Sequence, residues 1–299
     1  MGFFYAFITA LMWGLLPIGL KIHLEFLDAS TLNWFRFFVA GVFTATLLYR
    51  RNQLSFKKYL TPSLRLPLLI AALGLIGNYG FYAIGLQYIP PGTAQVVIQL
   101  APSILLLGSL IFFKESFSLT QGVGFAIVFL GLALFFNHRL EEIFSQLGDY
   151  TIGILFVAAA AASWATYALG QKAVGSALSP QETLLGIYIV GTLFFTPAAS
   201  PLEVIDFTLF QWLIFAFVAA NTIIAYGAFA AAMDCWESSR VSAVLTLIPV
   251  LTLLGVTTLE AITPHYQSGE VITWLSWLGA TTVVCGSLLA ALGRKKSSS

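Results

Sequence analysis

The sequence predicts an all-α integral membrane protein with ten transmembrane helices, arranged as two five-helix repeats of inverted topology. Three observations predict this fold class: a shortage of charge, ten apolar stretches of spanning length, and a similarity between the two halves. Of the 299 residues, 59% are hydrophobic and 9% are charged, whereas a soluble globular protein carries about 25% charged residues. This composition excludes a cytosolic enzyme and a disordered chain. The net charge of +1 offers no basic patch for nucleic acid.

Ten apolar stretches are long enough to cross a bilayer. They are continuous rather than alternating, which excludes the strands of a membrane β-barrel, and helices satisfy their own backbone polar groups in lipid. The first stretch has no basic segment before it and no cleavage pattern after it, so it is expected to be a retained span. The expected spans are residues 3–20, 31–49, 66–86, 93–112, 119–136, 151–171, 181–199, 207–231, 241–261 and 272–292.

The distribution of lysine and arginine predicts the orientation, because cytoplasmic loops are enriched in these residues. With ten spans, both termini lie on one side of the membrane. The opposite side receives only Lys21 and Arg139. The side of the termini receives Arg50, Arg51, Lys57, Lys58, Arg65, Lys114, Lys172, Arg240, Arg294, Lys295 and Lys296. Both termini are therefore predicted to be cytoplasmic, with residues 293–299 as a cytoplasmic tail.

The predicted repeats, residues 1–137 and 151–292, share residues at similar spacing. Each repeat holds five spans, an odd number, so the second copy must enter the membrane from the opposite side. Inverted repeats of this kind are typical of transporters that work by alternating access. The matched pairs are Trp13 with Trp164, Lys21 with Lys172, Tyr79 with Tyr226, Pro102 with Pro249, Gly124 with Gly279, and Gly131 with Gly286.

Several motifs make the chain resemble the drug/metabolite transporter superfamily, specifically its ten-helix EamA-type exporters. In the first half they are Trp13-Gly14 with Pro17, the stretches 36–41 and 82–94, Pro102, Glu115, Gly124 and Gly131. The second half keeps Trp164, Pro249, Glu260, Gly279 and Gly286 but lacks an equivalent of Arg36. The resemblance implies export of small metabolites, often amino acids. The aromatic-rich helices look most like those of exporters that accept aromatic amino acids.

Polar and aromatic residues on one face of several spans indicate a substrate site, because helices project residues four apart toward the same side. Each of these residues could instead serve helix packing or interhelical hydrogen bonding. The candidate cavity residues are Trp13, Asn78, Tyr79, Tyr82, Gln95, Gln99, Trp164, Tyr167, Asn221, Tyr226 and Thr246. Their aromatic rings could stack on apolar substrate groups or contact an ammonium group.

Prolines and charged residues indicate where the helices around such a site could bend and where gating or structural contacts could lie. Pro17, Pro102 and Pro249 are candidate hinges, because proline frees a backbone carbonyl one turn earlier. Glu115 and Glu260 lie at span ends, where they suit gating or capping contacts. Arg36 is expected to reach outward or to pair with a carboxylate such as Glu25 or Asp28.

The favoured function is export of amino acids, including aromatic ones, and related small metabolites across the inner membrane. Movement is expected to be gradient-driven or weakly proton-coupled, since no acidic residue lies near a span centre. The expected partners are the substrate and the lipid bilayer, and the expected state is a monomer or weak oligomer. No cofactor and no metal site are expected. The alternatives are efflux of cationic drugs, transport of purines or sugar derivatives, a membrane-embedded enzyme and a purely structural membrane protein.

Overall fold

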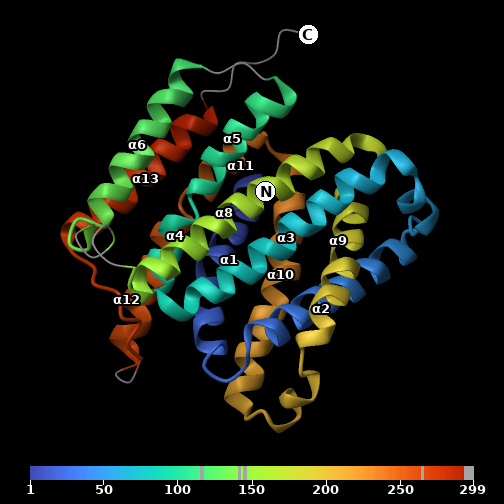
Figure 1. Ribbon diagram of the computed structural model, residues 1–299, viewed down its shortest axis with the longest axis horizontal. Helices are drawn as coiled ribbons and strands as arrows, with labels where there is room; N and C mark the ends of the chain where they lie inside the picture. Colours follow the sequence, from blue (N-terminus) through green and yellow to red (C-terminus); the bar gives the residue numbers. More distant parts are fainter. Residues whose placement is uncertain (115–117, 141–142, 144–146, 264–265, 293–299) are drawn as a thin grey trace.

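The computed structural model describes residues 1–114, 118–140, 143, 147–263 and 266–292, and all regular elements among them are helices (Figure 1). The first half contains α1 (Gly2–His23), α2 (Ala29–Arg50), η1 (Phe56–Leu60), α3 (Pro62–Tyr88), α4 (Pro91–Val97), α5 (Leu100–Phe113) and α6 (Leu119–Phe135). The second half contains α8 (Asp149–Val174), η2 (Gly175–Ala177), α9 (Pro180–Phe195), η3 (Thr196–Ala198), η4 (Pro201–Asp206), α10 (Leu209–Cys235), α11 (Ser238–Leu245), α12 (Ile248–Ile262) and α13 (Trp274–Leu292).

The helices match the predicted spans in number and order. Seven segments are long and apolar enough to cross a membrane: α1, α2, α3, α8, α10 and the consecutive pairs α4–α5 and α11–α12. Helix α6 and the apolar part of α13 are shorter, and α9 has 16 residues. Large apolar side chains such as Phe112 and Leu193 are exposed on the outside of the bundle, as expected of a surface that faces lipid. The fold is that of an all-helical membrane protein.

Two predicted spans, 93–112 and 241–261, are broken helices rather than continuous ones. The first is interrupted between Val97 and Leu100, and the second between Leu245 and Ile248. Proline explains the first break, because the ring of Pro102 would clash with the carbonyl four residues earlier in a continuous helix. That carbonyl, of Ile98, instead accepts a hydrogen bond from the nitrogen of Ala101 at 2.9 Å.

The second break follows the same rule, since Pro249 lies four residues after Leu245, where α11 ends. Pro17, by contrast, lies inside α1 without interrupting it. Discontinuous helices expose backbone groups near the membrane midplane and are common at transporter binding sites.

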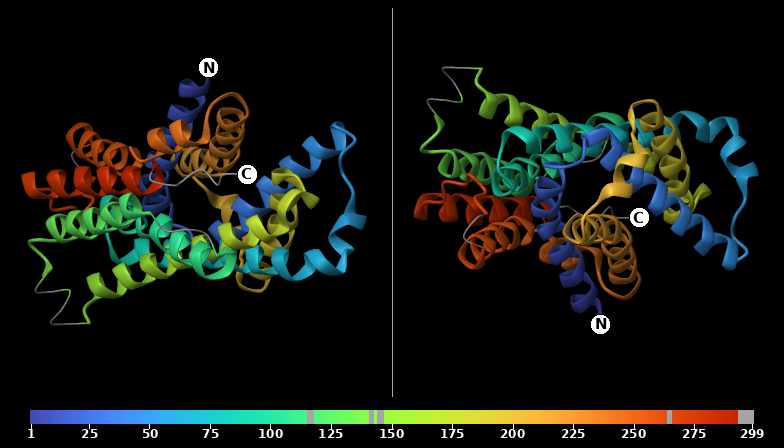
Figure 2. Two further views of the ribbon diagram at one scale, coloured as in Figure 1. Left: turned by 90° about the horizontal axis from the view of Figure 1, so that it is seen from above. Right: turned by 90° about the horizontal axis from the view of Figure 1, so that it is seen from below.

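The main helix contacts join the first half to the second. Helix α3 packs along α8, α1 along α10, α2 along α9 and α6 along α13. If the halves are exchanged, the α3–α8 pair becomes α10–α1, and the other two pairs map onto themselves. The pair α6 and α13 lies at one end of the molecule and the pair α2 and α9 at the other (Figure 2). The main helix pairs are thus unchanged when the two halves are exchanged.

Glycine lets α6 and α13 approach to backbone contact. A Cβ atom on Gly124 would lie 2.8 Å from the carbonyl oxygen of Gly286, and one on Gly131 would lie 2.9 Å from that of Gly279. Both distances are shorter than any ordinary contact, so a side chain at these positions would force the helices apart. The four matched glycines of the repeat therefore meet one another across this interface.

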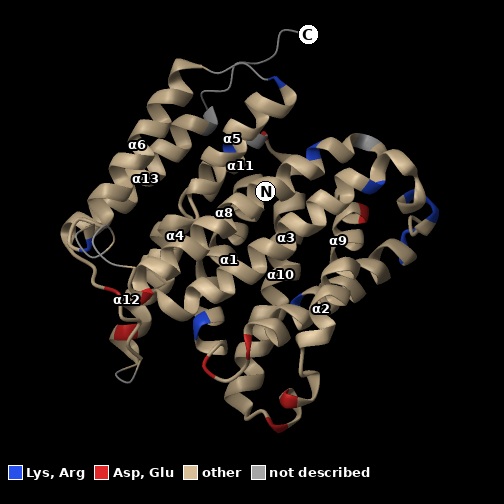
Figure 3. Cartoon of the chain, in the orientation of Figure 1, with Lys and Arg blue, Asp and Glu red and all other residues tan. Residues whose placement is uncertain are grey.

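Charged residues separate toward the two ends of the helices (Figure 3). Most lysines and arginines gather at the end where α2 and α3 are connected, and most acidic residues lie at the opposite end. Asp28 caps the start of α2, its Oδ1 accepting hydrogen bonds from the backbone nitrogens of Ser30 at 2.8 Å and Thr31 at 3.0 Å. This asymmetry agrees with the loop charges from which the orientation is predicted.

Candidate functional site

A cavity of about 400 Å³ lies between the two halves. Its walls come from α1, α2, α3, α8 and α10, from both broken helices, and from Ser287 of α13. Most of its surface is apolar or aromatic, with a few polar groups between, which is the usual make-up of a small-molecule site. The breaks before Pro102 and Pro249 border it, because Ile98, Gln99 and Thr246 all line it.

The structure brings ten of the eleven predicted cavity residues together around this space. They are Trp13, Asn78, Tyr79, Tyr82, Gln95, Gln99, Trp164, Asn221, Tyr226 and Thr246. Two of the three candidate hinge prolines, Pro17 and Pro102, also line it, whereas Pro249 is buried outside the lining. The eleventh residue, Tyr167, is 6% exposed and packs in the core between α3 and α8 instead.

Tyr167 misses the cavity because α3 and α8 approach too closely to leave space there. A Cβ atom on Gly74 of α3 would lie 2.3 Å from the backbone nitrogen of Tyr167. Trp164, one turn earlier on α8, carries its ring to the cavity and meets the Tyr167 ring edge to face at 6.3 Å. Of the two candidate cavity residues on α8, Trp164 therefore lines the cavity and Tyr167 does not.

Arg36 is placed differently from its expectation. Its side chain lines the cavity, is 6% exposed, and stacks its guanidinium carbon 4.0 Å from the centre of the Tyr79 ring. Nη1 donates to Oδ1 of Asn33 at 3.4 Å, and Nε is buried without a partner. Among the described residues Arg36 pairs with no carboxylate, and Asp28 is occupied in capping α2.

Two lining asparagines connect helices of different halves. Asn78 of α3 donates to the carbonyl of Ala160 on α8 at 3.0 Å, and Asn221 of α10 donates to that of Met12 on α1 at 2.6 Å. These bonds join the two helix pairs that correspond under the repeat. In both residues the amide nitrogen is used for helix packing, and the amide oxygen of Asn221 is buried without a partner.

The remaining lining groups are aromatic and amide side chains. Trp13 packs edge to face on Tyr226 at 5.5 Å between ring centres. The hydroxyl of Tyr82 donates to Oε1 of Gln95 at 2.9 Å. Gln99, at the break before α5, makes no side-chain hydrogen bond within the described part of the chain. This arrangement can hold an apolar or aromatic group between rings and a polar group against amides.

The family model for EamA-like transporters matches residues 1–137 and 151–292 of this chain. The chain belongs to the EamA-like transporter family. Members of this family are transporters, so the protein is a membrane transporter and not an enzyme. The two matched segments each contain one of the broken helices, and the cavity of this EamA-like protein lies between them.

Relatives of this EamA-like protein span nearly its whole length. It is 34% identical to an uncharacterized transporter of Haemophilus influenzae, over 99% of this chain and 96% of that protein. It is also 34% identical to the uncharacterized inner membrane transporter YhbE of Escherichia coli, over 98% of this chain and 92% of that protein. A probable amino-acid metabolite efflux pump of Salmonella typhimurium is 24% identical, over 97% of this chain and 94% of that protein.

Solved structures share the fold, among them a crystal structure that matches with a TM-score of 0.66 at 18% identity. The match covers 100% of this chain and 98% of that one. At this identity the likeness concerns the fold alone.

Of the two glutamates expected at span ends, Glu115 lies outside the described residues. Glu260 lies in the last turn of α12, where its Oε1 accepts hydrogen bonds from the backbone nitrogen of Ser268 at 2.9 Å and from the Ser268 hydroxyl at 2.6 Å. Glu260 therefore stabilises the loop between α12 and α13 and does not line the cavity.

That loop carries a contact that the sequence did not suggest. Oε2 of Glu270 accepts hydrogen bonds from the backbone nitrogens of Gly92 at 2.9 Å and Thr93 at 3.2 Å, and Oε1 accepts one from the Thr93 hydroxyl at 2.7 Å. Burial raises the pKa of the Glu270 carboxyl above its usual value. The second half thus caps the start of α4, which carries the lining residue Gln95.

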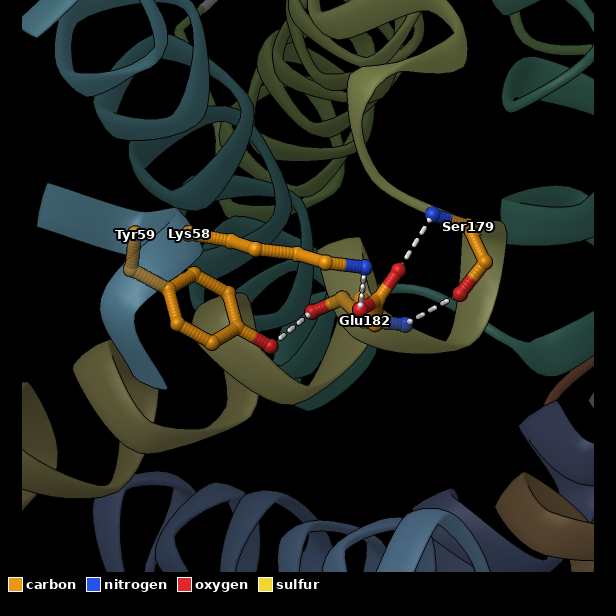
Figure 4. A network of polar contacts seen from close by, with 4 residues as sticks. All are labelled: Lys58, Tyr59, Ser179 and Glu182. Carbon is orange, nitrogen blue, oxygen red and sulfur yellow. Dashed lines mark hydrogen bonds and ion pairs between the residues drawn. The ribbon is translucent and has the colours of Figure 1, made fainter. Parts of the chain in front are cut away.

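A second network joins the halves near the opposite end (Figure 4). Lys58 of η1 forms an ion pair with Glu182 of α9 at 2.5 Å, and the hydroxyl of Tyr59 donates to the Glu182 carbonyl at 2.7 Å. Glu182 also forms a capping box with Ser179, accepting from its backbone nitrogen at 2.8 Å. No residue of α9 lines the cavity. The contact therefore holds the α2–α3 connection against α9 and does not cover the site.

Proposed function

We propose that this transporter exports amino acids, including aromatic ones, and related small metabolites from the cytoplasm across the inner membrane. Both termini are cytoplasmic in this proposal, as the loop charges predict. The substrate occupies the cavity between the halves and is released by alternating access. The observation that carries the proposal is the shared cavity, whose wall combines rings and amides beside two broken helices.

Two further observations support this assignment. Trp13, Trp164 and Tyr226 supply flat apolar surfaces of the kind that bind aromatic or large aliphatic side chains. The relative from Salmonella typhimurium is named a probable amino-acid metabolite efflux pump. Efflux of cationic drugs is disfavoured, since the only ionised side chain in the described lining is the cation Arg36.

The test is counterflow of labelled amino acids in proteoliposomes that contain the purified protein. We expect flux of phenylalanine above that of empty vesicles, without an imposed proton gradient. We expect Trp164→Ala and Tyr226→Ala to reduce it at least tenfold. The matched controls Trp274→Ala and Tyr49→Ala replace residues that are 74% and 72% exposed and outside the cavity, and should leave it unchanged. Absence of flux for every amino acid would refute the substrate assignment.

A further inference from the structure

Arg36 lies beside the cavity with unfilled hydrogen-bonding capacity. A guanidinium group has five N–H donors. In the described part of the chain one of them is engaged, by Asn33, and Nε is buried without a partner. A buried cation is unfavourable unless an anion or several acceptors compensate it. Tyr79 offers only its ring face, so the protein itself leaves this charge incompletely compensated.

The rest of the described lining contains no anionic group that would neutralise Arg36 or serve as counterion to a second cation. Its polar side chains are amides and hydroxyls, and it contains no aspartate or glutamate. A carboxylate entering the cavity would therefore supply the missing anion, and arginine suits this role because its planar fork matches a carboxylate. An ammonium group would lose its hydration and gain no counterion.

We propose that Arg36 binds the carboxylate of the substrate and thereby selects small aromatic or apolar monocarboxylates over amines. This inference rests on the proposed function and refines it. Carboxylates that lack a free ammonium group, such as deaminated or N-acylated amino acids, bind more tightly than the amino acids themselves. The aromatic wall holds the apolar body, and the break before α5 brings the amide of Gln99 to the same space.

Three probes with the same ring and different charges test this selectivity in detergent-solubilised protein by calorimetric titration. Phenyllactate is an anion, phenylalanine a zwitterion and phenylalaninamide a cation. We expect wild-type protein to bind phenyllactate at least tenfold more tightly than phenylalaninamide, with phenylalanine between them. Equal affinities, or tighter binding of the cation, would overturn the proposal with no variant required.

Substitution of the arginine then assigns the preference to one residue. We expect Arg36→Gln to weaken phenyllactate binding at least tenfold and to leave phenylalaninamide binding unchanged or stronger. Arg36→Lys keeps the charge without the fork and should keep the rank order at reduced affinity. The control Arg51→Gln changes an exposed arginine at the C-terminal end of α2, outside the cavity, and should bind all three probes as the wild type does.

The outcomes separate this inference from the proposed function. If Arg36→Gln folds and still binds phenyllactate like the wild type, the assignment of Arg36 is wrong, whatever the flux of amino acids. If it loses phenyllactate binding while the wild type transports no amino acid, the role of Arg36 stands and the amino-acid assignment falls. Should Arg36→Gln fail to fold, the wild-type rank order and Arg36→Lys still decide the question.

Discussion

The contact between α3 and α8 makes Gly74 a sensitive position for both stability and transport. An added Cβ at Gly74 would lie 2.3 Å from the nitrogen of Tyr167, 2.8 Å from the carbonyl oxygen of Ser163 and 2.8 Å from the Cα of Tyr167. All three atoms belong to the backbone of α8, so no side chain can rotate away. We therefore predict that Gly74→Ala destabilises the protein by separating the two helices.

The size of the effect follows from the same distances. An ordinary contact begins at 3.4 Å, so the nearest atoms must move apart by about 1.1 Å. A gap of 0.5–1 Å already removes roughly a quarter to a half of the dispersion energy of the atoms involved. Overpacked sites typically cost about 1–3 kcal/mol. We expect about 2–3 kcal/mol here, which corresponds to a fall in Tm of roughly 4–6 °C for a chain of this size.

The assay is thermal unfolding of the purified protein in detergent, followed by tryptophan fluorescence. Gly227→Ala is the matched control, since Gly227 lies inside α10 with no atom within 4 Å of the added Cβ. It should unfold at the wild-type temperature or slightly above, because alanine favours a helix by about 1 kcal/mol over glycine. Gly74→Ala should also lower flux, since Asn78, one turn away, bonds to Ala160 across the same interface. If the Tm of Gly74→Ala lies within about 1 °C of the Tm of Gly227→Ala, this reasoning is refuted.

Three further predictions concern polar contacts between the halves. Asn221→Leu removes the bond to Met12 and should lower stability by about 0.5–1.5 kcal/mol in a thermal melt; an unchanged melt would contradict a packing role. Lys58→Met removes the ion pair with Glu182. Because the Lys58 side chain is 47% exposed, the loss of unfolding free energy should be under about 1 kcal/mol and should shrink in about 1 M salt. Burial raises the pKa of the Glu270 carboxyl above its ordinary value of 4.5. The contribution of this carboxyl to stability is therefore fully present below pH 4.5 and is lost as the pH rises through the raised pKa. The Tm difference between wild type and Glu270→Gln should therefore shift in favour of the wild type on acidification from neutral pH; parallel curves would contradict this.

Local hydropathy was sufficient to predict the helices, because each span must satisfy its backbone and bury its side chains in lipid by itself. The same logic indicated ten residues that line the cavity, since polar side chains in a span avoid lipid and face the bundle interior. Their contact with substrate stays a prediction. Tyr167 lies in the core outside the cavity wall, although Trp164, three residues earlier on the same helix, lines it. Which of the two rings reaches the cavity depends on how closely Gly74 allows α3 to approach.

Contacts between distant segments could not be predicted in this way. Glu270 and Thr93 are separated by 177 residues, and Lys58 and Glu182 by 124. No periodicity in one segment carries information about such a partner. One expectation for Arg36 could have been weighed against a sequence signal, because an aspartate such as Asp28, just before an apolar stretch, is a typical helix N-cap. A capping carboxylate already accepts two backbone N–H groups, and this makes it a poor partner for Arg36.

The contacts made by Glu270 and by Glu182 between the halves differ in their relation to the cavity. The carboxylate of Glu270 is held by three donors at the start of α4, and Gln95 of that helix is a buried part of the cavity wall. Lys58 lies on η1 and Glu182 on α9, and neither element lines the cavity. The Glu270 contact therefore bears directly on the position of a helix in the cavity wall, because a shift of the loop that carries Glu270 must break three hydrogen bonds or move α4 with it. The Lys58–Glu182 contact has no such connection to the lining.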